Sequence, residues 1–267
     1  MASELKKFGT ICRQYKGTGY LYPNSASVKC SIEAVQYLDG DIRLRCIFSA
    51  KANFNENIMA SDALCFSGRT NDGKLLVVEG QLNCTYTTGS SRNTKSYYRL
   101  KGRLKIGEPN WADEVEVRFG LTNFIFTGNL AEPGSTHLNA TTFDIDGNLI
   151  FIRKLVDYKA IASEITSKKI INVTCQAHLS ISNYEDLILK KDILDHFTKL
   201  LTLAKGTFIS HVYFDIVGKD NLQIYSEHYP YITRSYISDP IIDDNPPNLI
   251  KFFVEATYKQ YTKLESE

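Results

Sequence analysis

The sequence predicts an α+β protein that is mostly β. Strand-like runs with alternating hydrophobicity recur through the first half of the chain, separated by turn signals, and no long helical pattern interrupts them. Apolar residues at helical spacing appear only in the last third of the chain. We therefore expect an antiparallel β-sandwich-like domain over residues 1–130, with an open barrel as the alternative. A smaller α+β domain over residues 137–240 and a C-terminal helix over residues 248–265 follow.

About seven strands are expected in the first domain, joined by turns rich in glycine, asparagine and aspartate. Their ranges are 20–22, 28–37, 42–48, 63–67, 75–86, 96–106 and 115–126. Residues 128–135 contain proline and two glycines and mark the predicted domain boundary. A hairpin over residues 141–154 is expected to turn at Asp146-Gly147-Asn148.

A long helix and the hairpin after it organise the second domain. Apolar residues recur at helical spacing over residues 183–204, and Ser182 with Glu185 three positions later predicts a capping box. Gly206 is expected to end the helix in the left-handed conformation. The period then changes to two, which predicts a hairpin over residues 208–229.

Composition and charge exclude several classes of protein. The chain is 43% hydrophobic, enough to form a core, and its net charge is +1, so any nucleic-acid binding must be local. Apolar runs are too short to span a membrane, and no signal peptide is visible, which predicts a cytoplasmic protein. The six cysteines are dispersed and form no C-x-x-C pair, so we expect reduced, buried thiols, no metal site and no cofactor.

The strand over residues 96–106 carries the strongest candidate binding surface. Alternation places a tyrosine and four cations on one face, and the preceding loop adds two more cations. These residues are Arg92, Lys95, Tyr97, Arg99, Lys101, Arg103 and Lys105. Such a row is suited to follow a phosphate backbone, with Tyr97 stacking on a base. The alternative is a solvated outer face whose cations pair with Glu114 and Glu116 on the next strand.

The C-terminal helix carries a second candidate surface. Leu249, Phe252, Phe253 and Ala256 share one side of it. Large apolar side chains on a terminal helix are expected to be covered by this chain, by a protein partner or by a further helical domain. We assign these four residues to partner binding.

The sequence gives less support for a catalytic function. His211 and Asp215 are expected on one face of their strand, with Glu227 near them across the hairpin, and a His–carboxylate pair is able to transfer protons. No nucleotide-binding glycine loop, nucleophile elbow or H-E-x-x-H motif is present in the sequence. Whether the protein is an enzyme therefore stays open, and we favour a non-enzymatic role.

Several segments resemble the β-rich N-terminal region of ApeA-like abortive-infection proteins. They are Gly17–Tyr22, Phe66–Thr70 with Gly73–Leu76, Leu121-Thr122-Asn123, and Asp192–Phe214 with Leu200–Gly206 at its centre. In that family the β-rich region precedes a helical HEPN ribonuclease domain, whose signature places a histidine a few residues after an arginine. None of the five histidines here follows that pattern. The resemblance therefore implies the sensing half without the nuclease, and no catalytic residue is carried over.

We accordingly expect a non-enzymatic recognition or regulatory module, a sensor or assembly subunit of a bacterial antiphage defence system. It would bind a protein partner through the terminal helix. A nucleic-acid-binding protein using residues 97–105 is the first alternative. A hydrolase or nuclease with an unrecognised site is the second.

Overall fold

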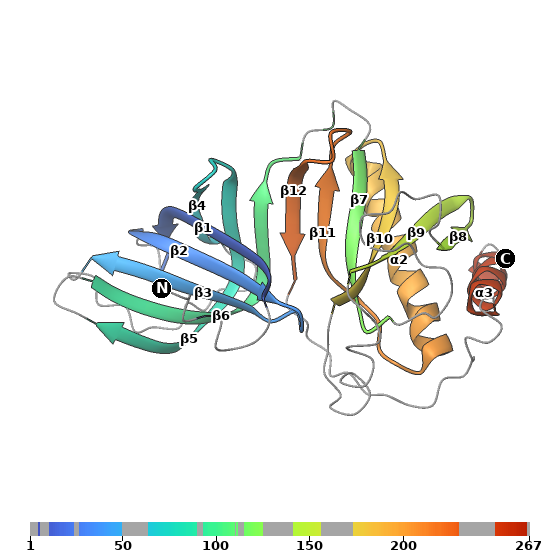
Figure 1. Cartoon of the computed structure of the whole chain (residues 1–267), viewed down its shortest axis with the longest axis horizontal. Coiled ribbons are helices and arrows are strands. Elements are labelled where there is room, and N and C mark those ends of the chain that lie inside the picture. Colours follow the sequence, from blue (N-terminus) through green and yellow to red (C-terminus); the bar gives the residue numbers. More distant parts are fainter. Residues whose placement is uncertain are drawn as a thin grey trace. The chain divides into compact units, whose positions relative to one another are not determined.

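The computed structural model confirms the predicted fold class, α+β and mostly β, with antiparallel strands and a C-terminal helix (Figure 1). It describes residues 5, 11–23, 27–49, 64–89, 93–109, 111, 115–124, 141–155, 173–229 and 249–265. The chain divides into two compact units. The first is Met1–Pro109 with Ile224–Ile232, and the second is Asn110–Gln223 with Thr233–Glu267. The predicted boundary at residues 128–135 lies outside the described residues.

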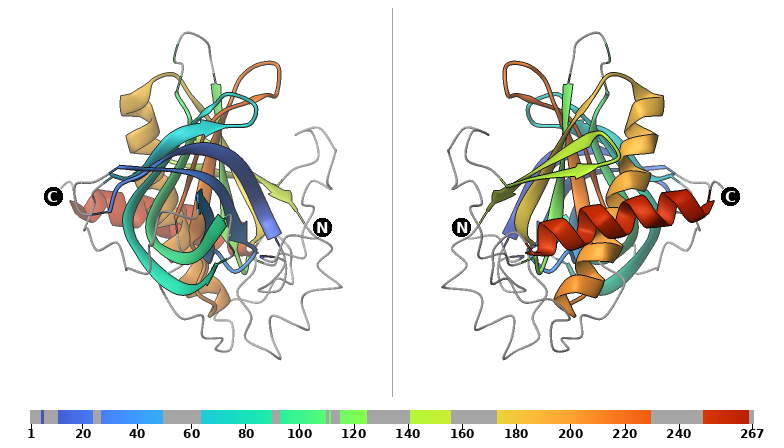
Figure 2. Two further views of the ribbon diagram at one scale, coloured as in Figure 1. Left: turned by 90° about the vertical axis from the view of Figure 1, so that its left-hand side faces the viewer. Right: turned by 90° about the vertical axis from the view of Figure 1, so that its right-hand side faces the viewer.

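The first unit is a closed barrel. Its strands are β1 (Ile11–Leu21), β2 (Val28–Tyr37), β3 (Ile42–Ser49), β4 (Leu64–Thr70), β5 (Leu75–Gly89) and β6 (Asn93–Gly107), with β12 (Gln223–His228) beside β6. The order is β3-β2-β1-β4-β5-β6, and β3 also pairs with β6, which closes the ring (Figure 2, left). Along one edge, β6 pairs with β3 at residues 93–99 and with β12 at residues 104–107.

Closure distinguishes this unit from the sandwich-like arrangement that we predicted. Paired glycines explain how the sheet bends far enough to close, because they let backbones approach at a barrel corner. Gly80 on β5 lies opposite Gly102 on β6, and a Cβ added at Gly102 would lie 2.8 Å from the Gly80 Cα. Side chains at this crossing would force the two strands apart.

The barrel interior is filled by apolar side chains and thiols. The largest are Phe48, Phe66 and Tyr98, and Cys30, Cys46 and Cys65 pack among them. All six cysteines of the chain are free. Burial raises the pKa of the Cys65 thiol to about 11, and the thiol donates a hydrogen bond of 2.7 Å to the Gly80 carbonyl. These thiols act as small apolar groups, as predicted.

The second unit is a five-stranded antiparallel sheet with helices on one face. Its elements are β7 (Val115–Thr122), β8 (Thr141–Ile145), β9 (Asn148–Lys154), β10 (Val173–Ile181), α2 (Tyr184–Lys205), β11 (His211–Val217) and α3 (Leu249–Glu265). The order is β11-β7-β10-β9-β8. The predicted hairpin of β8 and β9 is confirmed, with left-handed Asp146 and Gly147 at its turn. Phe143 on β8 packs against Phe197 on α2, with their ring centroids 5.0 Å apart.

The N-terminal cap of α2 lies one residue later than we predicted. Asn183 is the cap, and its side-chain oxygen accepts a hydrogen bond of 2.8 Å from the backbone N–H of Asp186. The Asp186 carboxylate accepts a reciprocal bond of 2.9 Å from the backbone N–H of Ser182. Asp186 therefore has the role that we assigned to Glu185, since the helix starts one residue further along the chain. Gly206 is left-handed at the other end, as predicted.

The helix α3 packs by a different face from the one that its aromatic residues suggested. Ile250, Val254 and Tyr258 are buried, and the helix crosses α2 (Figure 2, right). Glu255 accepts a hydrogen bond of 2.7 Å from the backbone N–H of Asp144, which ties α3 to β8. Phe252, in contrast, remains 70% exposed.

The glycine pair predicts where the barrel is least tolerant of substitution. Gly102→Ala should lower the free energy of unfolding by about 1–3 kcal/mol, because its new Cβ would meet the Glu79 carbonyl oxygen at 2.0 Å. Gly89→Ala is the matched control, since a Cβ there meets nothing within 4 Å. Urea denaturation of both variants tests this, and equal stabilities would contradict it.

Candidate functional site

The cations of β6 are largely committed to ion pairs within the first unit. Arg99 Nε lies 2.6 Å from Asp41 Oδ1, Lys105 Nζ lies 2.8 Å from Glu79 Oε2, and Arg103 Nη1 lies 3.9 Å from Glu227 Oε1. The expected pairing with Glu116 is wrong, because β6 pairs with β3, β5 and β12 and not with β7. Arg92 and Glu114 lie outside the described residues.

Tyr97 is not available to stack on a base. It is 2% exposed and packs with Leu5, Val35 and Tyr37, and its ring stacks on Tyr86 with centroids 4.1 Å apart. The alternation along β6 correctly predicts the face on which Tyr97 lies. That end of the face, however, is covered by Leu5, Val35 and Tyr37 and by the ring of Tyr86. Lys101 is exposed, and within the described residues it forms no ion pair; Lys95 is half-buried.

The residues of the catalytic alternative do not form one site in the described part of the chain. A bulge in β11 between His211 and Tyr213 shifts the alternation. His211 consequently lies near α2, with its Nδ1 3.4 Å from Asp195 Oδ1, whereas Asp215 stands opposite Arg118 in the sheet. Glu227 accepts a hydrogen bond of 2.9 Å from the Tyr225 hydroxyl.

The best-formed candidate site is a pocket of about 570 Å³ in the second unit. It lies where β7 begins and where β10 and β11 end, beside the start of α2. Val115, Glu116, Arg118, Ser180, Ile181, Ser182, Asp186, Val217, Gly218, Lys219 and Asn221 line it. This pocket has no local signal in the sequence, because its side chains come from segments about 100 residues apart.

Glu116 is the most strongly perturbed carboxylate of the pocket. Its Oε1 contacts His178 Nδ1 at 2.9 Å and also accepts a hydrogen bond from Arg118 Nε. Burial alone would raise the pKa of Glu116, but the hydrogen bonds and positive charges of His178 and Arg118 outweigh it and lower the pKa to about 2. Glu116 is therefore ionised at any physiological pH.

His178 links the pocket to a buried polar cluster. It is 1% exposed, and its second ring nitrogen, Nε2, lies 3.1 Å from the side-chain oxygen of Gln176. The Gln176 amide in turn donates a bond of 3.3 Å to the Tyr213 hydroxyl. Both ring nitrogens of His178 face oxygen atoms, so a doubly protonated ring satisfies both contacts. Tyr213 lies over Gly120, where a Cβ would come within 2.2 Å of its ring.

Arg118 is held at two points. Besides the bond to Glu116, its Nη2 donates a hydrogen bond of 2.6 Å to the side-chain oxygen of Asn221. Asn221 is left-handed, with φ of 63°, in the turn after β11. Arg118 Nη1 makes no hydrogen bond within the part of the chain that the structure describes. The guanidinium is thus fixed in orientation and retains donors for a ligand.

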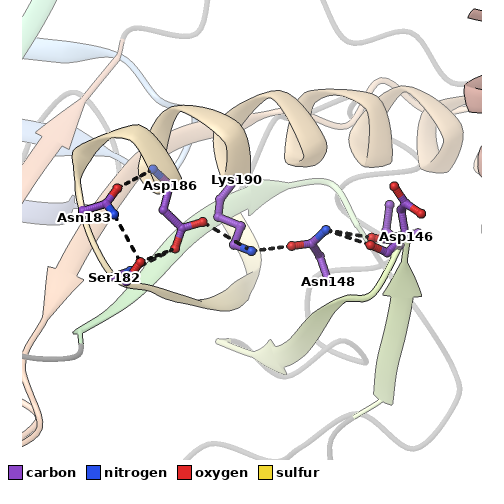
Figure 3. Close-up of polar contacts among 7 residues, drawn as sticks. Asp146, Asn148, Ser182, Asn183, Asp186 and Lys190 are labelled. Atoms are coloured by element: carbon purple, nitrogen blue, oxygen red, sulfur yellow. Dashed lines mark hydrogen bonds and ion pairs between the residues drawn. The ribbon is translucent and has the colours of Figure 1, made fainter. Parts of the chain in front are cut away.

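A second polar chain borders the pocket at the start of α2 (Figure 3). The Asp186 carboxylate lies 3.5 Å from Lys190 Nζ, and Lys190 also donates to the side-chain oxygen of Asn148 in the β8–β9 turn. The charged residues of the described lining are Glu116, Asp186, Arg118 and Lys219, so two carboxylates are balanced by two cations. Lys190 lies outside this lining and reaches it through its ion pair with Asp186.

No known protein family, curated protein or solved structure matches this chain. In the described parts of the chain, no helix is long and apolar enough to cross a membrane. Among the same residues, no group of three or more His, Cys, Asp or Glu side chains is arranged to hold a metal ion.

The Glu116 network predicts acid sensitivity. Its pKa lies below the ordinary value of 4.5, so the stabilisation is complete above about pH 4.5 and is lost as the pH falls toward 2. Glu116→Gln should therefore lower the free energy of unfolding by up to about 3 kcal/mol at pH 6, and the difference from wild type should shrink at pH 3. Urea denaturation at both pH values measures it. A difference that does not depend on pH would refute the ionic role.

Proposed function

We propose that the protein is a non-enzymatic recognition module whose second unit binds a small ligand bearing a carboxylate or phosphate group. The anchored guanidinium of Arg118 is the observation that carries this proposal. An arginine fixed at Nε and Nη2 loses little side-chain entropy when it binds an anion.

The chemistry of the pocket favours binding over proton transfer. A general acid or base works best when its pKa lies near the operating pH. The pKa of Glu116, at about 2, is far below that range, and the carboxylate is already occupied by His178 and Arg118. Glu116 is thus suited to orient Arg118. The volume of about 570 Å³ is in the usual range for small-molecule sites.

We further propose that the exposed side of α3 contacts a protein partner. Phe252 and Leu249 are the exposed members of the surface predicted from the sequence, whereas Phe253 and Ala256 are half-buried. An aromatic side chain as exposed as Phe252, at 70%, is a typical anchor for an interface. The resemblance to ApeA-like proteins supports a sensor or assembly subunit of a bacterial antiphage system, acting in the cytoplasm.

Thermal unfolding with and without inorganic phosphate or succinate tests the ligand proposal. We expect either anion to raise the Tm of the wild-type chain in a concentration-dependent way, because a ligand that binds only the folded state stabilises it. Asn221→Gly should weaken this effect, since it retains the left-handed turn and removes the oxygen that holds Arg118.

Lys101→Gln, at an exposed cation of β6 in the first unit, is the matched control and should leave the response to both anions unchanged. A response to succinate and phosphate that is identical in Asn221→Gly, Arg118→Gln and the wild type would refute the site. If neither anion shifts the wild-type Tm at millimolar concentration, the ligand class is wrong.

Affinity capture from cells of the source organism tests the partner surface. A stoichiometric partner should be retained by the wild type and lost with Phe252→Asp, because burying a carboxylate in an apolar interface is unfavourable. Leu203→Asp, at an exposed leucine on α2, is the control and should retain the partner. If Phe252→Asp also retains it, α3 is not the contact.

A further inference from the structure

The first unit carries a second pocket, of about 440 Å³, on the outer surface of β1, β2 and β4. Its lining combines aromatic, hydroxyl and positively charged side chains over a glycine floor. Thr18, Gly19, Tyr20, Tyr22, Lys29, Ser67, Gly68, Arg69 and Leu75 line it. Among the described residues of this lining there is no carboxylate and no side-chain amide, so their net charge is positive.

The cations of this pocket differ from the paired cations of β6, which are Arg99, Arg103 and Lys105. Lys29 and Arg69 are exposed, and neither forms an ion pair within the described residues. Arg69 Nη1 donates a hydrogen bond of 2.8 Å to the Gly73 carbonyl at the β4–β5 turn, which fixes the guanidinium without neutralising it. The charge of both residues therefore remains available to an anion.

Tyr20 lies between these two cations. It is 47% exposed, and in the register of the sheet it stands opposite Lys29 on β2 and Ser67 on β4. Side chains directly opposite one another in antiparallel strands have Cβ atoms about 5 Å apart, and diagonal neighbours such as Arg69 lie about 7–8 Å away. A flat group stacked on Tyr20 would have a cation within reach on each side.

Paired glycines shape the floor of the pocket. Gly19 lies opposite Gly68, and a Cβ added at Gly19 would lie 2.5 Å from the Gly68 Cα. The same Cβ would lie 2.7 Å from the ring of Phe66, a residue of the barrel core. These positions therefore exclude side chains, and they add bare backbone beside the exposed tyrosine.

We propose that this pocket binds a ligand with both a planar ring and a phosphate, which is the chemistry of a nucleotide, free or within a single strand. Tyr20 stacks on the base, and Lys29 and Arg69 contact the phosphate. An aromatic side chain flanked by cations in a shallow groove is the arrangement that sequence-tolerant nucleic-acid binding uses. This site is separate from the anion pocket of the second unit.

Fluorescence anisotropy with a labelled 12-nucleotide oligo-dT, with unlabelled AMP as competitor, tests the assignment. Tyr20→Leu should weaken binding roughly ten- to hundredfold, the usual loss for one stacked base. The pair Lys29→Gln and Arg69→Gln should also weaken it and should flatten the salt dependence, with a slope smaller by about 1.4 on the logarithmic scale. Lys101→Gln, at an exposed cation on β6, should change affinity and slope little.

The competitor separates the two sources of the ligand. AMP that displaces the oligonucleotide near its own micromolar affinity indicates a free-nucleotide site, and displacement only by unlabelled oligo-dT indicates a single-strand site. Absence of binding by both probes overturns the proposal. So does binding that Lys101→Gln weakens as much as Lys29→Gln with Arg69→Gln does. Circular dichroism of Tyr20→Leu confirms that a loss of binding is not a loss of fold.

Discussion

Closure of the barrel on β6 is the constraint on which the first unit depends. This strand has β5 along one edge and both β3 and β12 along the other. Each neighbour supplies a carboxylate to a β6 cation, through Glu79, through Asp41 before β3 and through Glu227. Arg43 and Arg99 stand directly opposite each other, and Asp41 bonds to both. We call the edge of β6 that pairs with β3 and β12 the closing seam of the barrel. The carboxylates along it explain the positive charge of β6, because Arg43 and Arg99 would repel each other without Asp41 between them.

The sequence predicted the fold class and most of the elements, because their patterns are local. It predicted β2 with the correct bounds and the β8–β9 hairpin with its turn. It missed most of β1, Ile11–Leu21, whose inward positions include Gly17 and Gly19, so the strand lacks the expected apolar alternation. Nothing local indicates that β12 pairs with β6, more than 100 residues earlier in the chain.

The difference between local patterns and long-range pairing also explains which features of the sites could be predicted from the sequence. Alternation placed the β6 cations correctly on one face, but their partners and the burial of Tyr97 depend on long-range pairing. The pocket around Arg118 needed the ends of three strands to meet at one edge of a sheet. The bulge in β11 separated His211 from Asp215, and a single added residue of this kind leaves no clear sequence signal. Lys29 and Arg69 became candidates only when the register showed them on either side of Tyr20.

Both proposed sites rely on arginines whose orientation is fixed by acceptors in their own unit, Glu116 and Asn221 for Arg118 and the Gly73 carbonyl for Arg69. The central claim is that cations in the closing seam of the barrel stabilise the fold, whereas those beside Tyr20 recognise a ligand. Amide chemical shifts of the full chain, titrated with the 12-nucleotide oligo-dT, test it most directly. We predict shifts at Thr18–Tyr22, Lys29 and Ser67–Arg69. Shifts confined to residues 97–105 would contradict it.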